Sequence, residues 1–343
     1  MRKELLLLGA FGMLTTATLC AQEFHLQPTP QEYITQKDSV DIPRQYQILS
    51  GNSVQDGPAL PLLRSLMPEE VLGASFRVYI GVKGDKIIKK YQHRIPRKSE
   101  GYFLKIEKDC IVIAGADERG AYYGVQTLAQ LLALDKLPLA EVTDYPDVPY
   151  RGVVEGFYGA PWSQEACIRQ LDFYGRNKMN VYIYGPKDDP YHRTPNWRKP
   201  YPAREGEELK VLVNRAKENN VIFYWAIHPG QDIRWNEEDR SLLLQKFESM
   251  YQLGVRGFAV FFDDISGEGT KADKQAELLN YIDDHFVKVK RDVAPLILCP
   301  TEYNKSWTDV EGGYLTTLGD KLNEGIKVMW TGDMVVATID KST

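Results

Sequence analysis

The segment Phe258-Ala259-Val260-Phe261-Phe262 is apolar at every position and is followed by two acids, Asp263 and Asp264. A strand with one solvated face alternates apolar and polar residues, whereas a strand buried on both faces is apolar throughout. The segment therefore predicts a central strand of a parallel sheet. The two carboxylates are expected to emerge at its carboxyl end.

Five further runs of strand length lie around this segment, separated by helical patterns. The strand candidates cover residues 151–157, 179–185, 221–228, 296–300 and 326–330, and the helix candidates cover residues 163–174, 207–218, 238–253 and 275–289. Alternating strands and helices predict an α/β fold with parallel strands and crossover helices. Polar or aromatic residues follow every strand, which favours a (β/α)8 TIM-type barrel with its site at the strand ends.

A doubly wound sheet is the alternative to the barrel. However, Glu155-Gly156-Phe157-Tyr158-Gly159 puts bulky aromatic residues where a phosphate-binding loop needs glycines. Only about six strands are found in residues 148–343, and this region is shorter than the ~250 residues of a typical barrel. We therefore expect a barrel truncated at its C-terminus. The parent protein is expected to be active, and this chain by itself to be unstable or inactive.

Residues 22–147 follow a different pattern, in which short strand-like runs alternate with turns. Strands are predicted at residues 46–49, 76–80, 102–106 and 110–113. A helix opens at Asp117 and continues to Leu132 with apolar residues at helical spacing. These elements predict a small α+β domain before the barrel domain of residues 148–343. The proline-punctuated segment 144–149 is the predicted boundary.

Residues 1–21 are predicted to form a signal peptide. Arg2 and Lys3 precede an apolar run over residues 5–19 that is too short to span a bilayer comfortably. A buried N-terminal helix is the alternative. Cys20 allows a lipoprotein, although the large leucine before it makes a poor lipidation site. We expect an exported protein, periplasmic or extracellular, with no membrane span.

The charge of the chain gives no basis for a nucleic-acid partner, because 42 Lys and Arg residues stand against 47 Asp and Glu residues. Cys110, Cys167 and Cys299 are widely spaced, and their odd number argues against a disulfide framework or a zinc ribbon. His228 and Glu302 lie at strand ends without the spacing of metal ligands. No metal or cofactor is predicted, and the oligomeric state stays open.

Three pairs of adjacent aspartates occur in the chain. Asp283-Asp284 lies in a helical stretch with a separate apolar stripe, which predicts a solvated helix face. Asp188-Asp189 lies in a loop after the second strand of the barrel and is either structural or ligand-facing. Asp263-Asp264 ends the most apolar strand and is the candidate catalytic pair. The alternative for this last pair is a helix cap and a salt bridge.

Two adjacent carboxylates in a cleft repel each other, which is expected to separate their pKa values so that one donates a proton while the other stays ionised. Their Cα atoms lie only ~3.8 Å apart, whereas the two acids of a conventional glycosidase are ~5–9 Å apart. A 2-acetamido sugar removes this difficulty, because its amide oxygen can attack its own anomeric carbon. One aspartate then holds the amide N–H and the other protonates the leaving oxygen.

Six motifs stand in a fixed order along the chain. They are residues 151–159 (RGVVEGFYG), 184–189 (YGPKDD), 227–230 (IHPG), 261–265 (FFDDI), 299–303 (CPTEY) and 330–333 (WTGD). Their order and spacing resemble those of glycoside hydrolase family 84, which contains the O-GlcNAcases and related bacterial β-N-acetylglucosaminidases. The resemblance includes the exported Bacteroides-type enzymes of that family. With the region around Glu118-Arg119-Gly120, the resemblance covers nearly all of the mature chain.

The resemblance implies roles for individual residues. Asp263 would orient and polarise the acetamido group, and Asp264 would be the general acid that then acts as base for water. The substrate-binding residues that it implies are Gly156, Lys187, Cys299, Tyr303, Thr331 and Val335. Tyr303 would hydrogen-bond the acetamido oxygen, and Cys299 would line the pocket of the acetyl group. Lys187 and the carbonyl of Gly156 would bind sugar hydroxyls. Thr331 and Val335 would line the region around the sugar and its aglycone.

The resemblance therefore implies a retaining exo-β-N-acetylglucosaminidase that releases terminal β-linked N-acetylglucosamine from glycoproteins or glycans through an oxazoline intermediate. The resemblance also implies a later Trp, an Asn pair and an Asp that complete the pocket, and none of these is found in this sequence. Two other functions stay open. One is a carbohydrate-binding pseudoenzyme, and the other is a hyaluronan-degrading endo-glycosidase.

Overall fold

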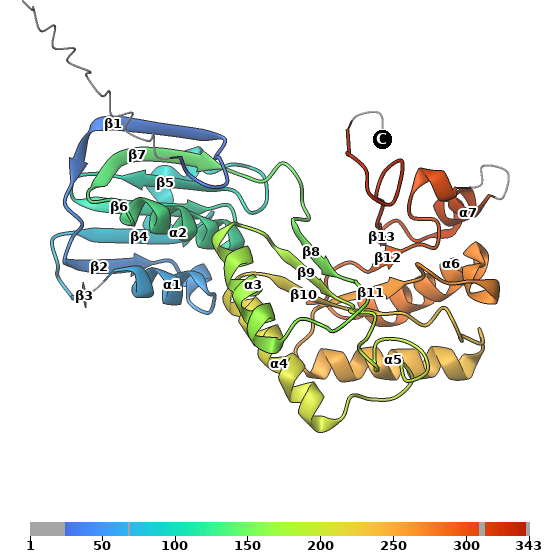
Figure 1. Cartoon of the computed structure of the whole chain (residues 1–343). Helices are drawn as coiled ribbons and strands as arrows, with labels where there is room; N and C mark the ends of the chain where they lie inside the picture. Colours follow the sequence, from blue (N-terminus) through green and yellow to red (C-terminus); the bar gives the residue numbers. More distant parts are fainter. Residues whose placement is uncertain (1–24, 68, 309–312, 341–343) are drawn as a thin grey trace, which may run out of the picture.

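The computed structural model describes residues 25–67, 69–308 and 313–340. The predicted signal peptide, residues 1–21, lies outside these residues. The described chain forms a seven-stranded sheet and a six-stranded sheet, which stand beside each other in Figure 1. No described helix combines the length and the apolar character needed to cross a bilayer.

The first sheet is mixed and has the strand order β1-β7-β5-β6-β4-β2-β3. Its strands are β1 (Glu32–Val40), β2 (Gln45–Ser50), β3 (Glu69–Glu70), β4 (Arg77–Val82), β5 (Tyr102–Ile106), β6 (Cys110–Gly115) and β7 (Leu137–Asp144). Helices α1 (Ala59–Leu66) and α2 (Glu118–Leu132) pack beside each other along it (Figure 1). The carboxylate of Asp117 accepts a hydrogen bond from the amide of Gly120, which explains why α2 begins where the sequence predicts it.

The four strands and the helix predicted in this region are all present, but the strands β1, β3 and β7 and the helix α1 were not predicted. Strand β1 is largely exposed and carries no apolar alternation, so periodicity does not reveal it. It joins the sheet by antiparallel pairing with β7, which lies about a hundred residues later in the chain. Such long-range pairing is decided by the tertiary structure.

The second sheet is a curled half-barrel in which every strand pairing is parallel, with the order β13-β12-β11-β10-β9-β8. Its strands are β8 (Gly152–Glu155), β9 (Val181–Tyr184), β10 (Ile222–Ile227), β11 (Gly257–Phe261), β12 (Ile297–Cys299) and β13 (Lys327–Val328). All six match predicted strands. Within the described residues β8 and β13 are the edges of the sheet, which agrees with the prediction of a TIM-type barrel with about six strands present.

Five helices accompany this half-barrel in the described residues: α3 (Gln164–Arg176), α4 (Ala203–Glu218), α5 (Glu237–Gln252), α6 (Ala272–Ile282) and α7 (Tyr314–Lys321). Strand β11 shows how they are packed. Phe258 and Val260 belong to the core shared with the helices, whereas Ala259 and Phe261 belong to a smaller cluster of strand residues. All four are buried, so both faces of β11 are covered, as its apolar sequence predicts.

The prediction of a solvated Asp283-Asp284 pair is wrong for Asp283. Helix α6 ends at Ile282 and passes into a π-helical turn, Asp283–Val287, in which the amide of Lys288 donates to the carbonyl of Asp283. Asp283 is buried and accepts a hydrogen bond from Asn323 Nδ2 at 2.8 Å. Asp283 follows the buried residues Ala276 by seven positions and Leu279 by four, so helical spacing itself brings it to the edge of the buried face.

A buried polar cluster joins the two sheets. Lys178 Nζ lies 2.8 Å from both Asp144 Oδ2, at the end of β7, and the Tyr102 hydroxyl in β5. Next to it, the guanidinium of Arg151 and the amide of Asn180 both donate to the carboxylate of Glu100. Burial lowers the pKa of Lys178, so its charge depends on the carboxylate of Asp144. These contacts fix the N-terminal ends of β8 and β9 to the first sheet.

The substitution Asp144→Asn is expected to lower the free energy of unfolding by roughly 3–5 kcal/mol, because it leaves a buried ammonium without its counter-charge. Urea unfolding at pH 7 measures the change. The matched control is Asp41→Asn, which removes the carboxylate of the exposed Lys136–Asp41 pair and should cost less than about 1 kcal/mol. Equal losses in the two variants would contradict this view of the cluster.

Candidate active site

The candidate site lies where the strands of the half-barrel end. Lys187 follows β9, His228 follows β10 and Asp263 follows β11. The carboxyl ends of parallel strands share one edge of the sheet, so residues far apart in sequence meet there. Of the residues predicted from the sequence, Lys187 contacts Asp263 directly at this edge, and Cys299 and Tyr303 lie in or against the cluster of strand residues there.

Asp263 and Lys187 form a buried ion pair. Lys187 Nζ lies 2.6 Å from Asp263 Oδ2, and the two side chains are only 1% and 14% exposed, respectively. Burial opposes ionisation of Asp263, but the nearby imidazole of His228 and the ammonium of Lys187 hold its pKa well below the usual range. From the sequence, the repulsion between Asp263 and Asp264 was expected to shift their pKa values. In the structure, the pKa of Asp263 is lowered by Lys187 and His228, which follow other strands.

The second carboxylate oxygen of Asp263 is open to a ligand. Oδ1 is buried and makes no hydrogen bond to any described residue. The nearest histidine nitrogen, His228 Nε2, is 3.5 Å from Oδ1 and lies closer, at 2.7 Å, to the main-chain oxygen of Asp263. A buried, ionised oxygen without a donor is costly unless a bound molecule supplies one. Asp263 can therefore accept a hydrogen bond from an N–H or O–H group of a ligand.

Asp264 stands in a different environment from its neighbour. It is exposed, and its backbone has φ = +54°, a left-handed conformation that is uncommon outside glycine. Its Oδ2 accepts a hydrogen bond at 3.2 Å from the hydroxyl of Tyr158, in the loop after β8. One carboxylate is thus buried against a cation, and the other is in contact with solvent. This difference suits one acid for charge stabilisation and the other for proton transfer.

Cys299 and Tyr303 lie beside the two acids. Cys299, the last residue of β12, is buried in the strand cluster, and Tyr303 packs against that cluster. Burial raises the pKa of the Cys299 thiol well above its ordinary value, so Cys299 offers a neutral, apolar wall. Burial and the charges of Asp264 and Asp263 raise the pKa of Tyr303 to about 12. Its hydroxyl therefore remains a hydrogen-bond donor.

The other three predicted residues lie on loops around the strand ends. Thr331 donates its amide proton to the Tyr303 carbonyl at 2.9 Å, which ties the loop after β13 to the loop after β12. Gly156 follows β8 and is partly buried, and Val335 is 44% exposed. No hydrogen bond or ion pair among the described residues joins Gly156 or Val335 to the aspartate pair.

Three contacting residues at this edge were not assigned a role from the sequence: Tyr158, His228 and Glu155. Glu155 is fully buried, and its carboxylate accepts hydrogen bonds from the Trp162 amide and the Tyr182 hydroxyl. It thereby holds both ends of the loop that carries Tyr158. For Glu155, the only signal in the sequence was the position of an acid at the end of an apolar strand. In the described part of the chain, no group of three or more His, Cys, Asp or Glu side chains could hold a metal ion.

The Asp188-Asp189 pair is resolved by its contacts. Asp189 is buried and accepts hydrogen bonds from the hydroxyls of Tyr184 and Tyr201 at 2.8 and 2.9 Å, so its role is structural. Asp188 is exposed and accepts from the amide of Gly159 at 2.7 Å. Its contact orders the same loop that presents Tyr158 to Asp264.

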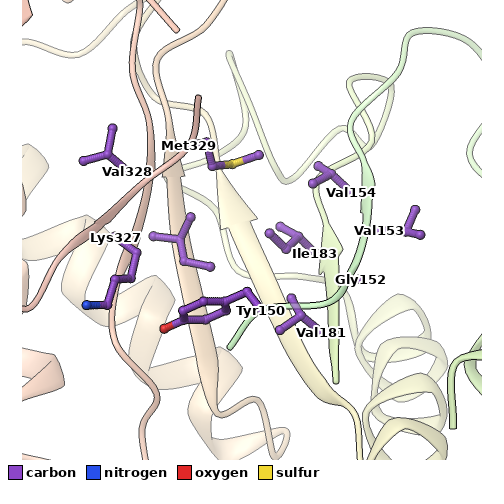
Figure 2. Close-up of a pocket in the computed structure, with 10 residues that line it drawn as sticks. Tyr150, Gly152, Val153, Val154, Val181, Ile183, Lys327, Val328 and Met329 are labelled. Carbon is purple, nitrogen blue, oxygen red and sulfur yellow. The ribbon is translucent and has the colours of Figure 1, made fainter. Parts of the chain in front are cut away.

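A cavity of about 260 Å³ lies between the two edges of the half-barrel. Figure 2 shows Lys327 and Val328 of β13 on one side of it, and Val181 and Val154 of β9 and β8 on the other. Its lining is mostly aliphatic and includes none of the predicted site residues. The cavity is thus part of the barrel interior between the edge strands, separate from the polar site at the strand ends.

Comparisons with known proteins match both parts of the chain. A family model described as beta-N-acetylglucosaminidase matches residues 151–343, and one described as glycosyl hydrolase family 20, domain 2, matches residues 23–145. Protein O-GlcNAcase of Rattus norvegicus is 37% identical over 195 residues, which are 54% of this chain and 21% of that protein.

Two solved structures are similar over most of the chain. The structure of CpGH84B has a TM-score of 0.84 and 36% identity, and the match covers 91% of this chain and 57% of that chain. The structure of CpGH84D has the same TM-score with 28% identity, and the match covers 94% of this chain and 58% of that chain. The chain therefore spans little more than half the length of these structures and about a fifth of the rat relative.

The substitution Lys187→Met is expected to raise the pKa of Asp263, because burial then acts without the ammonium. In the unaltered protein the pKa of Asp263 in the folded state lies below the unfolded value of ~3.9. Ionisation of Asp263 therefore stabilises the fold at pH values above ~3.9. This contribution is lost as the pH falls through the folded-state pKa. The stability difference between the two proteins should therefore be larger at pH 7 than at pH 3. Chemical denaturation across this range measures it, and a pH-independent difference would count against the ion pair.

Proposed function

This chain belongs to the β-N-acetylglucosaminidase family, whose model spans more than half of it, and on that premise we propose that it is a glycoside hydrolase acting on terminal β-linked N-acetylglucosamine. The match bears out the resemblance of its motifs to glycoside hydrolase family 84. Glycoproteins or glycans outside the cytoplasm are the proposed substrates, in keeping with the signal peptide predicted for residues 1–21.

The observation that supports this proposal best is the unpaired Oδ1 of Asp263. Lys187 binds the other oxygen and keeps the carboxylate ionised, so Oδ1 is a strong acceptor with no donor among the described residues. The N–H of a 2-acetamido group is a donor of the right kind. Holding this N–H increases the electron density on the amide oxygen, which can then attack the anomeric carbon from the face opposite the leaving group.

The proposed reaction proceeds in two steps. In the first, the amide oxygen forms a bond to the anomeric carbon, the glycosidic C–O bond breaks, and Asp264 gives its proton to the leaving oxygen. The Tyr303 hydroxyl donates to the acetamido oxygen as the oxazoline forms. In the second, Asp264 takes a proton from water, whose oxygen attacks the same carbon and opens the oxazoline. Two displacements at one carbon give net retention of configuration.

The exposure of Asp264 agrees with its proposed role. A general acid that becomes a general base must exchange its proton with solvent between turnovers, and the carboxylate of Asp264 is in contact with solvent. The hydroxyl of Tyr158 restrains that carboxylate without neutralising it. Asp263, paired with Lys187 and ionised, is unsuited to donate a proton. The different surroundings of the two adjacent acids therefore support different tasks for them.

Fluorination of the N-acyl group is expected to slow hydrolysis steeply, because each fluorine makes the amide oxygen a poorer nucleophile. The measurement is kcat/KM for aryl N-acetyl, N-fluoroacetyl, N-difluoroacetyl and N-trifluoroacetyl glucosaminides. A protein whose carboxylate attacks the sugar directly would give rates that hardly depend on the acyl group. Binding of these sugars without turnover would instead indicate a pseudoenzyme.

The substitutions Asp263→Asn and Asp264→Asn are expected to separate the two roles. Asp264→Asn should lower kcat by roughly 10²–10⁴-fold on substrates with poor leaving groups and far less on 2,4-dinitrophenyl glycosides, which need little protonation. Asp263→Asn should lower kcat for both kinds of substrate, because it removes the acceptor for the amide N–H. Indistinguishable leaving-group profiles for the two variants would refute this division of labour. The exposed variant Asp284→Asn is the control.

A further inference from the structure

His228 lies between the two strands that carry the Asp263–Lys187 pair. It follows β10, which is hydrogen-bonded to β9 on one side and to β11 on the other. The residue is 1% exposed, and its amide donates to the carbonyl of His192 at 2.9 Å, so its main chain is fixed. Its ring is directed at the start of the turn that contains the acids, where Nε2 lies 2.7 Å from the main-chain oxygen of Asp263.

The partners of the ring determine what it can do. A carbonyl oxygen only accepts hydrogen bonds, so Nε2 carries a proton and donates it to the main-chain oxygen of Asp263. Nδ1 is buried and has no partner among the described residues. His228 therefore acts on the backbone of Asp263 through its Nε2–H.

The carbonyl that His228 holds belongs to the peptide bond between Asp263 and Asp264. The φ angle of Asp264, +54°, describes the rotation of its backbone relative to this peptide plane. A fixed peptide plane therefore helps to hold Asp264 in its left-handed conformation. That conformation is unfavourable in a residue other than glycine, so it persists only when the surroundings impose it. The preceding carbonyl, of Phe262, is also held, by the hydroxyl of Thr301 at 2.9 Å.

We propose that His228 is a positioning residue: its Nε2–H holds the Asp263–Asp264 peptide so that Asp263 turns toward Lys187 while Asp264 turns toward Tyr158 and solvent. This inference rests on the proposed function, because it assigns His228 a task in that reaction. The neighbouring His192 plays no such part. Its Nδ1 contacts the carbonyl of Ala226 at 2.6 Å, and burial lowers its pKa to about 3, so it adds no charge behind His228.

The kinetic test compares His228→Gln with His228→Leu in the full-length protein. A glutamine amide reaches about as far as Nε2 and can donate to the same carbonyl, whereas leucine fills similar space without a donor. His228→Leu should lose at least tenfold more kcat on a methyl or alkyl N-acetylglucosaminide than on the 2,4-dinitrophenyl substrate, because a misplaced Asp264 protonates poorly. His228→Gln should recover most of this loss. Replacing the exposed His285 by glutamine is the control.

The leaving-group comparison separates positioning from stability. A loss of folded protein lowers the rates on all substrates by one factor, whereas a misplaced acid lowers them selectively. A uniform loss in His228→Leu, or a rate equal to that of the unaltered protein, would overturn the proposal. If the unaltered full-length protein hydrolyses none of these substrates, the proposed function fails, and the crystal structures described below then decide the positioning of the turn by themselves.

Crystal structures of the two variants supply a readout that does not depend on activity. In His228→Leu, the Asp263–Asp264 peptide is expected to rotate, Asp264 to leave the left-handed region, and the contact between Lys187 Nζ and Asp263 Oδ2 to lengthen beyond hydrogen-bonding distance. In His228→Gln, the turn is expected to keep φ near +54° at Asp264. An unchanged turn in His228→Leu would show that His228 does not position the pair.

Discussion

The buried ion pair between Lys187 and Asp263 is the constraint on which the site depends. Removing an ammonium and a carboxylate from water is costly, and it is tolerated only when the two groups meet in good geometry. Lys187 follows β9 and Asp263 follows β11, two strands that are separated by β10. The curvature of the sheet lets their loops meet above the end of β10. His228 occupies the position beneath this pair.

The neighbours of each acid, rather than their repulsion, distinguish Asp263 from Asp264. Asp263 faces the interior of the half-barrel, where Lys187 and His228 hold it ionised. Asp264 turns outward because its backbone adopts a left-handed conformation, and the hydroxyl of Tyr158 meets it there. A single change of backbone direction between two consecutive residues thus gives them different environments. Adjacent acids can therefore carry out different steps of one reaction.

The first sheet supports the site from a distance. Its strands β5 and β7 supply Tyr102 and Asp144, which bind Lys178 immediately before β9. Arg151, immediately before β8, binds Glu100, which belongs to the domain of the first sheet. The N-terminal ends of β8 and β9 are fixed in this way, and the loops after their C-terminal ends carry Tyr158 and Lys187. Within the described residues the other edge of the half-barrel, β13, has a neighbour on one side only.

The sequence alone determined the strands of the half-barrel, because strands buried on both faces must be apolar and their ends must carry the polar residues. It also predicted that Asp263 and Asp264 emerge at the carboxyl end of the most apolar strand, and they follow β11 in the structure. It did not reveal β1 or β7, whose stability comes from pairing across the chain. Nor did it show that Lys187, His228 and Tyr158 contact the two acids, because sheet curvature and backbone direction set these contacts. Only the tertiary structure decides which side chains from separate strands come within hydrogen-bonding distance, since that depends on packing between residues remote in sequence.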